Sequence, residues 1–89
     1  MEVRQLEIIN KKGLHARAAA KLINLTQTFE ADVVLVKGDN EVNGKSLLGL
    51  LMLAAHQGTW LTIRASGEDE GVAIQKICNL IESKFEESE

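Results

Sequence analysis

The chain has 89 residues, of which 45% are hydrophobic and 26% charged, and its formal net charge is −3 at pH 7. This composition is typical of a folded protein rather than a disordered chain, and the length predicts a single domain over residues 1–89. The acidic balance and an aromatic content of 3% argue against nucleic acid as a partner.

The sequence also argues against a membrane segment, a disulfide and a metal site. The longest apolar run, residues 47–55, is about half as long as a bilayer-spanning helix, and the N-terminus lacks the basic and apolar regions of a secretory signal. Cys78 is the only cysteine, and no group of potential ligands has the spacing of a metal site. We therefore expect a cytoplasmic protein that needs no cofactor and does not insert into a membrane.

The first half of the chain alternates between the apolar patterns of strands and helices. Residues 2–9 suit a strand, whereas residues 16–29 place their apolar side chains on one helical stripe. The β-branched segment 31–37 predicts a second strand, and the turn-forming sequence at 38–40 leads into a short third strand at 41–43.

The second half predicts two more helices around a fourth strand. Residues 46–55 suit a short helix whose first residue, a serine, is the N-cap. Residues 59–66 alternate covered and outward side chains, which predicts a strand with one buried face. Beyond the acidic turn at 67–70, apolar residues at helical spacing as far as Phe85 predict a closing helix, and we expect the tail at 85–89 to fray in solvent.

The predicted elements follow one another in the order β-α-β-β-α-β-α. A mixed order with a hairpin in the middle favours an antiparallel sheet that carries its helices on one face. We therefore predict an α+β fold, an open-faced β-sandwich in which three helices cover one face of a four-stranded antiparallel sheet.

His15 is the first candidate for chemistry, because it lies between a glycine turn and the start of the first predicted helix. The first N–H groups of a helix lack partners and, with the helix dipole, form a site for an anion such as phosphate. Arg17 adds a guanidinium fork that suits phosphate oxygens, and a neutral imidazole is a nucleophile. A histidine that accepts a phosphoryl group fits this pattern, although a solvent-facing turn or capping residue is the commoner role at such a position.

Two stretches extend this interpretation to a family. Gly-Leu-His-Ala-Arg before an alanine-rich helix, and EVNGKSLLGLLMLAA at 41–55, resemble the two signatures of the HPr family of histidine phosphocarriers of the bacterial phosphoenolpyruvate-dependent phosphotransferase system. The resemblance covers nearly the whole chain. It implies that His15 carries the phosphoryl group as pros-phosphohistidine, on Nδ1, and that Arg17 and the backbone of Ala16 and Arg17 bind the phosphate.

The same resemblance implies the partners. Enzyme I would be the phosphoryl donor, sugar-specific or regulatory domains would be the acceptors, and the protein would be a monomeric carrier rather than an enzyme. Two branches of the family stay open: a carrier that serves sugar uptake, and a nitrogen-branch regulatory protein whose phosphorylation state controls its partners. A small α/β module without phosphotransfer is a third and less favoured alternative.

Ala18 departs from the family pattern, which has proline at this position. Proline is tolerated in the first turn of a helix, because the N–H that proline lacks is not needed there. Alanine fits as well and adds an N–H donor. We therefore expect the chemistry to survive, with the transfer rate or the phosphohistidine lifetime as the properties that the change affects.

The second signature contains a serine and an apolar helix. Ser46 can cap that helix, and the resemblance implies a second role, as the target of an HPr kinase/phosphatase. The short helix is apolar nearly all round, so that part of it must be exposed. The resemblance assigns partner contact to Leu47, Leu48 and Met52.

Overall fold

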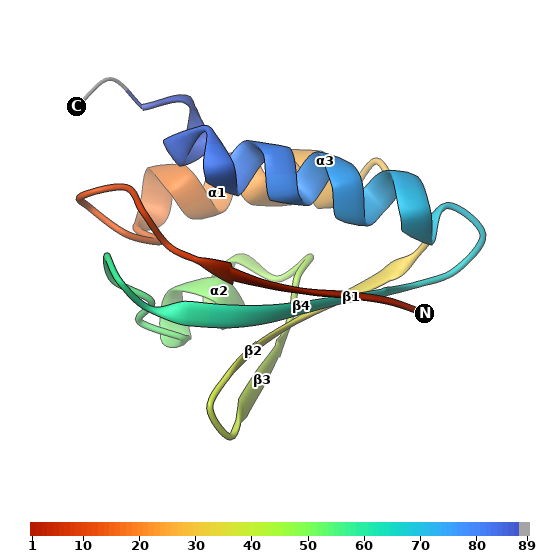
Figure 1. Ribbon diagram of the computed structural model, residues 1–89, viewed down its shortest axis with the longest axis horizontal. Helices are drawn as coiled ribbons and strands as arrows, with labels where there is room; N and C mark the ends of the chain where they lie inside the picture. Colours follow the sequence, from red (N-terminus) through yellow and green to blue (C-terminus); the bar gives the residue numbers. More distant parts are fainter. Residues whose placement is uncertain (88–89) are drawn as a thin grey trace.

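The computed structural model describes residues 1–87, and its elements are shown in Figure 1. They are β1 (Glu2–Glu7), α1 (Ala16–Thr26), β2 (Asp32–Lys37), β3 (Asn40–Asn43), α2 (Leu47–Met52), β4 (Trp60–Ser66), α3 (Glu70–Glu82) and the short 3₁₀ helix η1 (Lys84–Glu86). This order confirms the predicted sequence of strands and helices, to which η1 is an addition.

The four strands form one antiparallel sheet in the order β1-β4-β2-β3. Helices α1 and α3 lie side by side over one face of it, and α2 packs beside α1 and against β3 (Figure 1). The predicted α+β fold, an open four-stranded sheet with three helices, is therefore confirmed.

The core lies between the sheet and the helices and follows from the alternation of side chains along the strands. On β4, Leu61, Ile63 and Ala65 are buried while Trp60 points outward. These side chains meet Leu22 of α1 and the apolar stripe of α3. Each fully buried leucine or isoleucine stabilises the fold by roughly 1.5–3 kcal/mol, which makes this layer the main support of the site described below.

Helices α1 and α2 end earlier than their apolar patterns predicted, as α3 also does. Helix α1 ends at Thr26, whose hydroxyl donates to the carbonyl oxygen of Gly44 at 2.9 Å, and not at residue 29. Helix α2 ends at Met52, and not at residue 55, because the chain turns at Ala54, which has a positive φ of 50°. The carbonyl oxygen of Ala55 is thereby free to accept a hydrogen bond from another loop.

The prediction for the C-terminal tail is wrong over residues 85–87, whereas residues 88–89 lie outside the described part of the chain. Helix α3 ends at Glu82, and Phe85 is fully buried in η1 rather than on the helix. The chain reverses in η1 because Lys84, Phe85 and Glu86 have φ values of 59°, 56° and 62°. This turn sends the tail back towards the start of α1.

Candidate functional site

His15 is the N-cap of α1, as the sequence predicted. Its backbone is extended, with φ −81° and ψ 179°, and its carbonyl oxygen accepts the first helical hydrogen bond from Ala19 at 2.8 Å. The N–H groups of Ala16, Arg17 and Ala18 therefore have no acceptor within the helix. No side chain caps this end and no acidic residue lies in its first turn, so that the amides are available to an anion.

The loop before the helix is fixed in a conformation that requires glycine. Gly13 has a φ of +66°, and a Cβ atom on it would lie 2.5 Å from the carbonyl oxygen of Ala55. Leu14 donates from its N–H to that same oxygen at 2.8 Å. Asn10, which is fully buried, donates from Nδ2 to the carbonyl oxygen of Gly13 at 2.8 Å. These contacts fix the position of His15 relative to the segment that follows α2.

A carboxylate from the other end of the chain reaches the imidazole. Glu87 Oε2 lies 2.5 Å from His15 Nε2, and Glu87 Oε1 accepts a hydrogen bond from Asn10 Nδ2 at 2.9 Å. The His15 side chain keeps 26% of its surface exposed, against 11% for Glu87. The ring is thus held at Nε2, and part of its surface remains exposed.

The environment of Glu87 favours its ionised form. Burial acts to raise the pKa of this carboxyl, but the hydrogen bonds from Asn10 and His15, together with the charges of His15 and Lys12, outweigh it. The balance holds the pKa of Glu87 below its ordinary value. A carboxylate, and not a neutral acid, therefore faces the imidazole at neutral pH.

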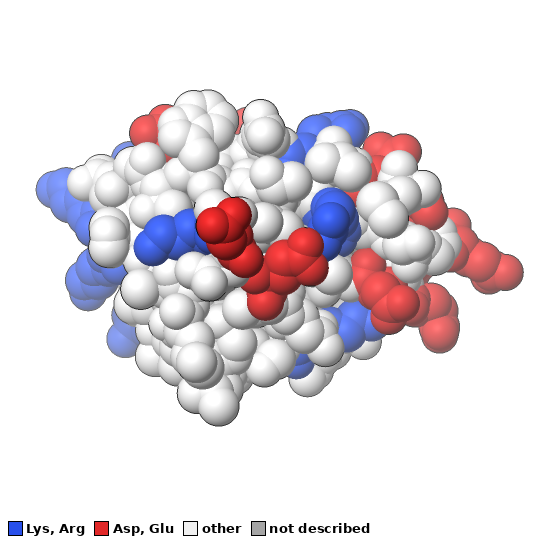
Figure 2. All heavy atoms as spheres, turned by 90° about the horizontal axis from the view of Figure 1, so that it is seen from below, with Lys and Arg blue, Asp and Glu red and all other residues white. Residues whose placement is uncertain are grey.

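Arg17 lies in the same helical turn as the free amides and is exposed. Among residues 1–87 no ion pair or hydrogen bond holds its guanidinium. Figure 2 shows Lys and Arg side chains at the left end of one face and most Asp and Glu side chains towards its centre and right end. The left end is also the end that carries the loop before α1 in Figure 1, and Lys11 and Lys12 of that loop are exposed.

Ser46 caps α2, as the sequence predicted. Its Oγ accepts a hydrogen bond from the N–H of Gly49 at 3.1 Å, and its backbone is extended, as an N-cap requires. Ser46 is partly exposed. Its hydroxyl therefore has a structural role and remains within reach of solvent.

Helix α2 presents an apolar patch, which we define as Leu47, Leu48, Leu51 and Met52. Leu48 and Met52 are the most exposed, at 68% and 73%, while Leu50 on the opposite side of the helix is fully buried. Leu51 is a member that the sequence analysis did not select. Exposed apolar side chains gathered on one short helix are typical of a surface that contacts other proteins.

The imidazole and the segment that follows α2 lie next to each other. A small hollow of about 160 Å³ joins the loop before α1 to the segment after α2. Its lining residues are Lys12, Leu14, His15, Ala54, Ala55 and His56. The hollow thus lies between His15 and the segment that begins two residues after Met52 of the patch.

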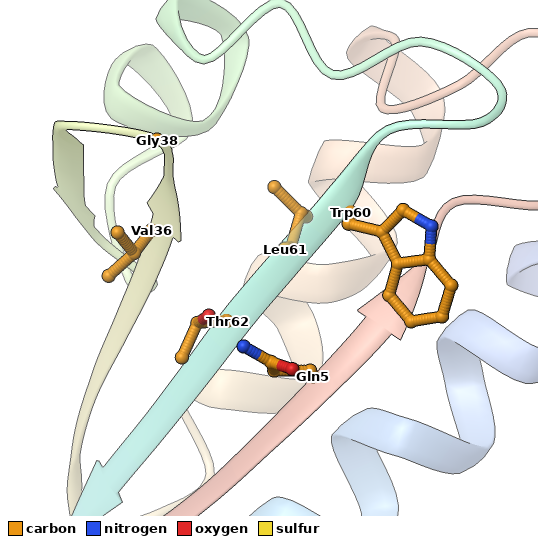
Figure 3. Close-up of a pocket in the computed structure, with 6 residues that line it drawn as sticks. All are labelled: Gln5, Val36, Gly38, Trp60, Leu61 and Thr62. Atoms are coloured by element: carbon orange, nitrogen blue, oxygen red, sulfur yellow. The ribbon is translucent and has the colours of Figure 1, made fainter.

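A larger hollow of about 320 Å³ lies on the outer face of the sheet and is shown in Figure 3. Its lining residues are Gln5, Val36, Gly38, Trp60, Leu61 and Thr62. In Figure 3 the indole of Trp60 lies towards β1, and the amide of Gln5 lies beside Thr62. None of the six side chains is ionisable near neutral pH, so that this hollow offers no imidazole or carboxylate nucleophile.

The rest of the described chain contains few reactive groups. Within residues 1–87 no three His, Cys, Asp or Glu side chains gather as metal ligands would. Burial raises the pKa of the Cys78 thiol, which disfavours the reactive thiolate. None of the helices in this part of the chain is long and apolar enough to cross a bilayer.

The structure thus brings His15, Ala16 and Arg17 together at one helix end and places the segment that follows α2 beside His15. Sequence reasoning missed Asn10 and Glu87. Asn10 carried a weak signal, since asparagine three residues before glycine is common in turns. Glu87 carried none, because its neighbours in the acidic tail have the composition of a solvated end.

Comparisons with known proteins identify the family. A family model described as the PTS HPr component phosphorylation site matches residues 3–83. The phosphocarrier protein NPr of Shewanella violacea is 44% identical over 85 residues, which cover 96% of this chain and 93% of that protein. The phosphocarrier protein HPr of Xylella fastidiosa is 45% identical over 83 residues, which cover 93% of each chain. The crystal structure of HPr-C-His from Thermoanaerobacter tengcongensis superposes with a TM-score of 0.96 at 39% identity and covers 100% of both chains.

Proposed function

Because the chain belongs to the HPr family of phosphocarrier proteins of the phosphotransferase system, we propose that His15 accepts a phosphoryl group from phosphorylated enzyme I and passes it to downstream acceptor domains. The observation that supports this proposal most directly is the position of His15 as N-cap of α1, with its ring partly exposed beside free amides. The protein is in this scheme a covalent carrier, and the turnover belongs to its partners.

The geometry suits a direct transfer between two proteins. The lone pair of His15 Nδ1 forms the bond to phosphorus, and the bond between phosphorus and the donor breaks with its electron pair left on the donor. The amides of Ala16 and Arg17 and the guanidinium of Arg17 then face the phosphoryl oxygens. Proximity and these fixed donors supply the catalysis, and transfer to the acceptor is the same step in reverse.

We propose the apolar patch and the basic groups around it as the docking surface. Leu47, Leu48 and Met52 provide exposed apolar area, and Arg17 provides positive charge that would attract an acidic partner surface. The free carrier is expected to be a monomer, which light scattering after size-exclusion chromatography would test.

Regulation at Ser46 by an HPr kinase/phosphatase is a second part of the proposal. A phosphoryl group on this N-cap would add a charge of roughly −1.5 to −2 next to the free end of α2 and the apolar patch. An acidic partner surface would then be repelled. Incubation with such a kinase and ATP should add one phosphoryl group at Ser46, and a Ser46→Ala variant should remain unmodified.

The nitrogen-branch alternative is supported by the relative named NPr, whose identity of 44% nearly equals the 45% of the relative named HPr. In that case the acceptor is a regulatory domain rather than a sugar transporter domain. Parallel transfer assays from the phosphorylated carrier to one acceptor of each kind would separate the two branches.

The carrier function itself is tested with phosphoenolpyruvate and enzyme I. The chain should take up one acid-labile, alkali-stable phosphate, and His15→Ala should abolish this labelling. His56→Ala is the matched control, because it removes the other histidine of the chain, which is exposed. Labelling that persists in His15→Ala and disappears in His56→Ala would overturn the assignment.

A further inference from the structure

We propose that Glu87 is a positioning residue that selects the reactive nitrogen of His15, because its carboxylate holds the ring proton on Nε2 and leaves Nδ1 as the nucleophile. This inference rests on the proposed function of His15. It extends that proposal to the C-terminal tail, which no sequence pattern placed in the site.

The first support is the arrangement of the carboxylate. One oxygen of Glu87 lies 2.5 Å from His15 Nε2, and the other accepts from Asn10 Nδ2 at 2.9 Å. Asn10 is itself fully buried and donates to the carbonyl oxygen of Gly13 at 2.8 Å. The carboxylate is therefore oriented by a buried amide that belongs to the same loop as the histidine.

The second support is the direction of the hydrogen bond. An ionised carboxylate can only accept, so in the neutral ring the proton must be on Nε2. Among residues 1–87 the other ring nitrogen, Nδ1, has no hydrogen-bond partner. A carboxylate that fixes the tautomer of a histidine in this way also fixes the direction of its lone pair.

The third support is the backbone that brings Glu87 to the site. Lys84, Phe85 and Glu86 all have positive φ values, a conformation that L residues rarely adopt. Burial of Phe85 and the hydrogen bond that Lys21 Nζ donates to its carbonyl oxygen at 2.7 Å hold this turn in place. Backbone conformations of this kind persist where the surrounding structure imposes them, and they cluster at functional sites.

The role of Glu87 adds no new bond to the transfer step. The lone pair of Nδ1 forms the bond to phosphorus, the donor keeps the electron pair of the bond that breaks, and the proton stays on Nε2. Without the carboxylate the proton can move to Nδ1, and the fraction of molecules with a nucleophilic Nδ1 falls. Glu87 thus acts through the imidazole and does not touch the phosphoryl group.

The test compares Glu87→Gln with Glu86→Gln. Both variants lose one negative charge from neighbouring positions, but only Glu87 contacts His15. Nitrogen-15 chemical shifts of the neutral imidazole, read on folded protein with unchanged amide spectra outside the site, report which ring nitrogen carries the proton. We expect the proton on Nε2 in the wild type and in Glu86→Gln, and a substantial shift towards Nδ1 in Glu87→Gln.

The second readout is the rate of phosphoryl transfer from enzyme I. We expect a roughly 10-fold loss in Glu87→Gln, at the lower end of the effects seen when a residue that orients a histidine is removed, because the ring is partly exposed. Glu86→Gln should transfer at the wild-type rate.

Several results would overturn the inference. A wild-type ring with its proton on Nδ1, a tautomer equilibrium that Glu87→Gln leaves unchanged, or a rate equal to that of Glu86→Gln would each do so. A faster transfer in Glu87→Gln would do so too, since the carboxylate would then be a competitor of the incoming phosphate. If the wild type takes up no phosphate at all, the carrier proposal fails, while the tautomer measurement still reports on Glu87.

Discussion

Leu14 donates its N–H to the carbonyl oxygen of Ala55 at 2.8 Å, and this hydrogen bond joins the loop before α1 to the segment after α2. It ties the imidazole at one helix end to the apolar patch on another helix. Two parts of the chain that are far apart in sequence are thereby held together.

Gly13→Ala should destabilise the protein and slow phosphorylation of His15. The new Cβ would lie 2.5 Å from the oxygen of Ala55 and 2.7 Å from Cα of His56, and backbone atoms of this kind cannot move aside cheaply. We expect the free energy of unfolding to fall by about 1–3 kcal/mol because of overpacking. A side chain at positive φ should lower it by a further 1–2 kcal/mol, roughly. Urea denaturation measures the sum.

Gly38→Ala is the control for that experiment. Gly38 has a similar φ of +59°, but a Cβ atom there would meet nothing within 4 Å. Only the cost of the positive φ, about 1–2 kcal/mol, should appear, and phosphorylation should be unchanged. Equal losses in the two variants would show that the close approach of Gly13 to Ala55 does not exist.

Ala18→Pro should leave the fold intact and stabilise it slightly. The N–H of Ala18 has no acceptor in the helix, because the first helical bond comes from Ala19, so proline removes no hydrogen bond. The free energy of unfolding is expected to rise by about 0.4–1 kcal/mol, because proline reduces the conformational freedom of the unfolded chain. Thermal and urea unfolding measure it.

Ala20→Pro provides the contrast, because position 20 lies one residue beyond the first helical bond, inside α1. Proline there should lower the free energy of unfolding by about 3 kcal/mol. If both variants were destabilised to the same extent, α1 would begin earlier than residue 16. The same Ala18→Pro sample shows whether the lost N–H changes the lifetime of the phosphohistidine.

The double variant Leu48→Ser with Met52→Ser should weaken binding to enzyme I without a loss of stability. Both side chains are exposed, at 68% and 73%, so their removal costs the isolated fold little. Removal of two apolar contacts from an interface should lower the affinity on the order of 10-fold. Titration calorimetry measures the affinity.

Val72→Ser is the matched control for the patch, because Val72 is exposed to 54% on α3 and is outside the patch. Its affinity for enzyme I should equal that of the wild type. A comparable loss in the control would place the docking surface elsewhere or make it less specific than proposed.

Asp69 should contribute stability that is lost in acid. The hydrogen bond from the N–H of Glu30 outweighs the effect of burial and, with the bond from Ala31, holds the pKa of Asp69 below its ordinary value of 3.8. The contribution of a carboxyl with a lowered folded-state pKa is complete above the unfolded value and disappears as the pH falls through the folded value.

The measurement is the free energy of unfolding in urea between pH 7 and about pH 2. Asp69→Asn should be less stable than the wild type at pH 7, and the difference should shrink towards the acid end. Asp39→Asn changes an exposed turn residue that makes no such bonds within residues 1–87. The difference in free energy of unfolding between this variant and the wild type should not change with pH. A difference for Asp69→Asn that is constant with pH would contradict the account.

Much of the fold and part of the site could be predicted because their signals are local. Period-two and helical apolar patterns gave the order of the elements, and the residues of the helix end, His15 to Arg17, lie within one turn of each other. A helix start exposes its amides whatever the rest of the chain does. The anion site is therefore a property of a short stretch of sequence.

The end of α2 and the position of the C-terminal tail depend on tertiary contacts, which no local sequence pattern contains. Helix α2 ends at Met52 although the apolar run continues to residue 55, because the chain turns at Ala54 and the carbonyl oxygen of Ala55 then accepts from Leu14. The tail looked solvated because its residues are mostly acidic, yet burial of Phe85 turns it back onto the molecule.

The sequence by itself determined which residues could bind and hold a phosphoryl group, since their neighbours in the chain supply the amides and the charge. Only the tertiary structure decided what faces the other side of the imidazole, because Glu87 lies 72 positions from His15 along the chain. That contact exists only after the sheet has brought the start of α1 and the end of α3 together, so it depends on packing and not on any pattern of nearby residues.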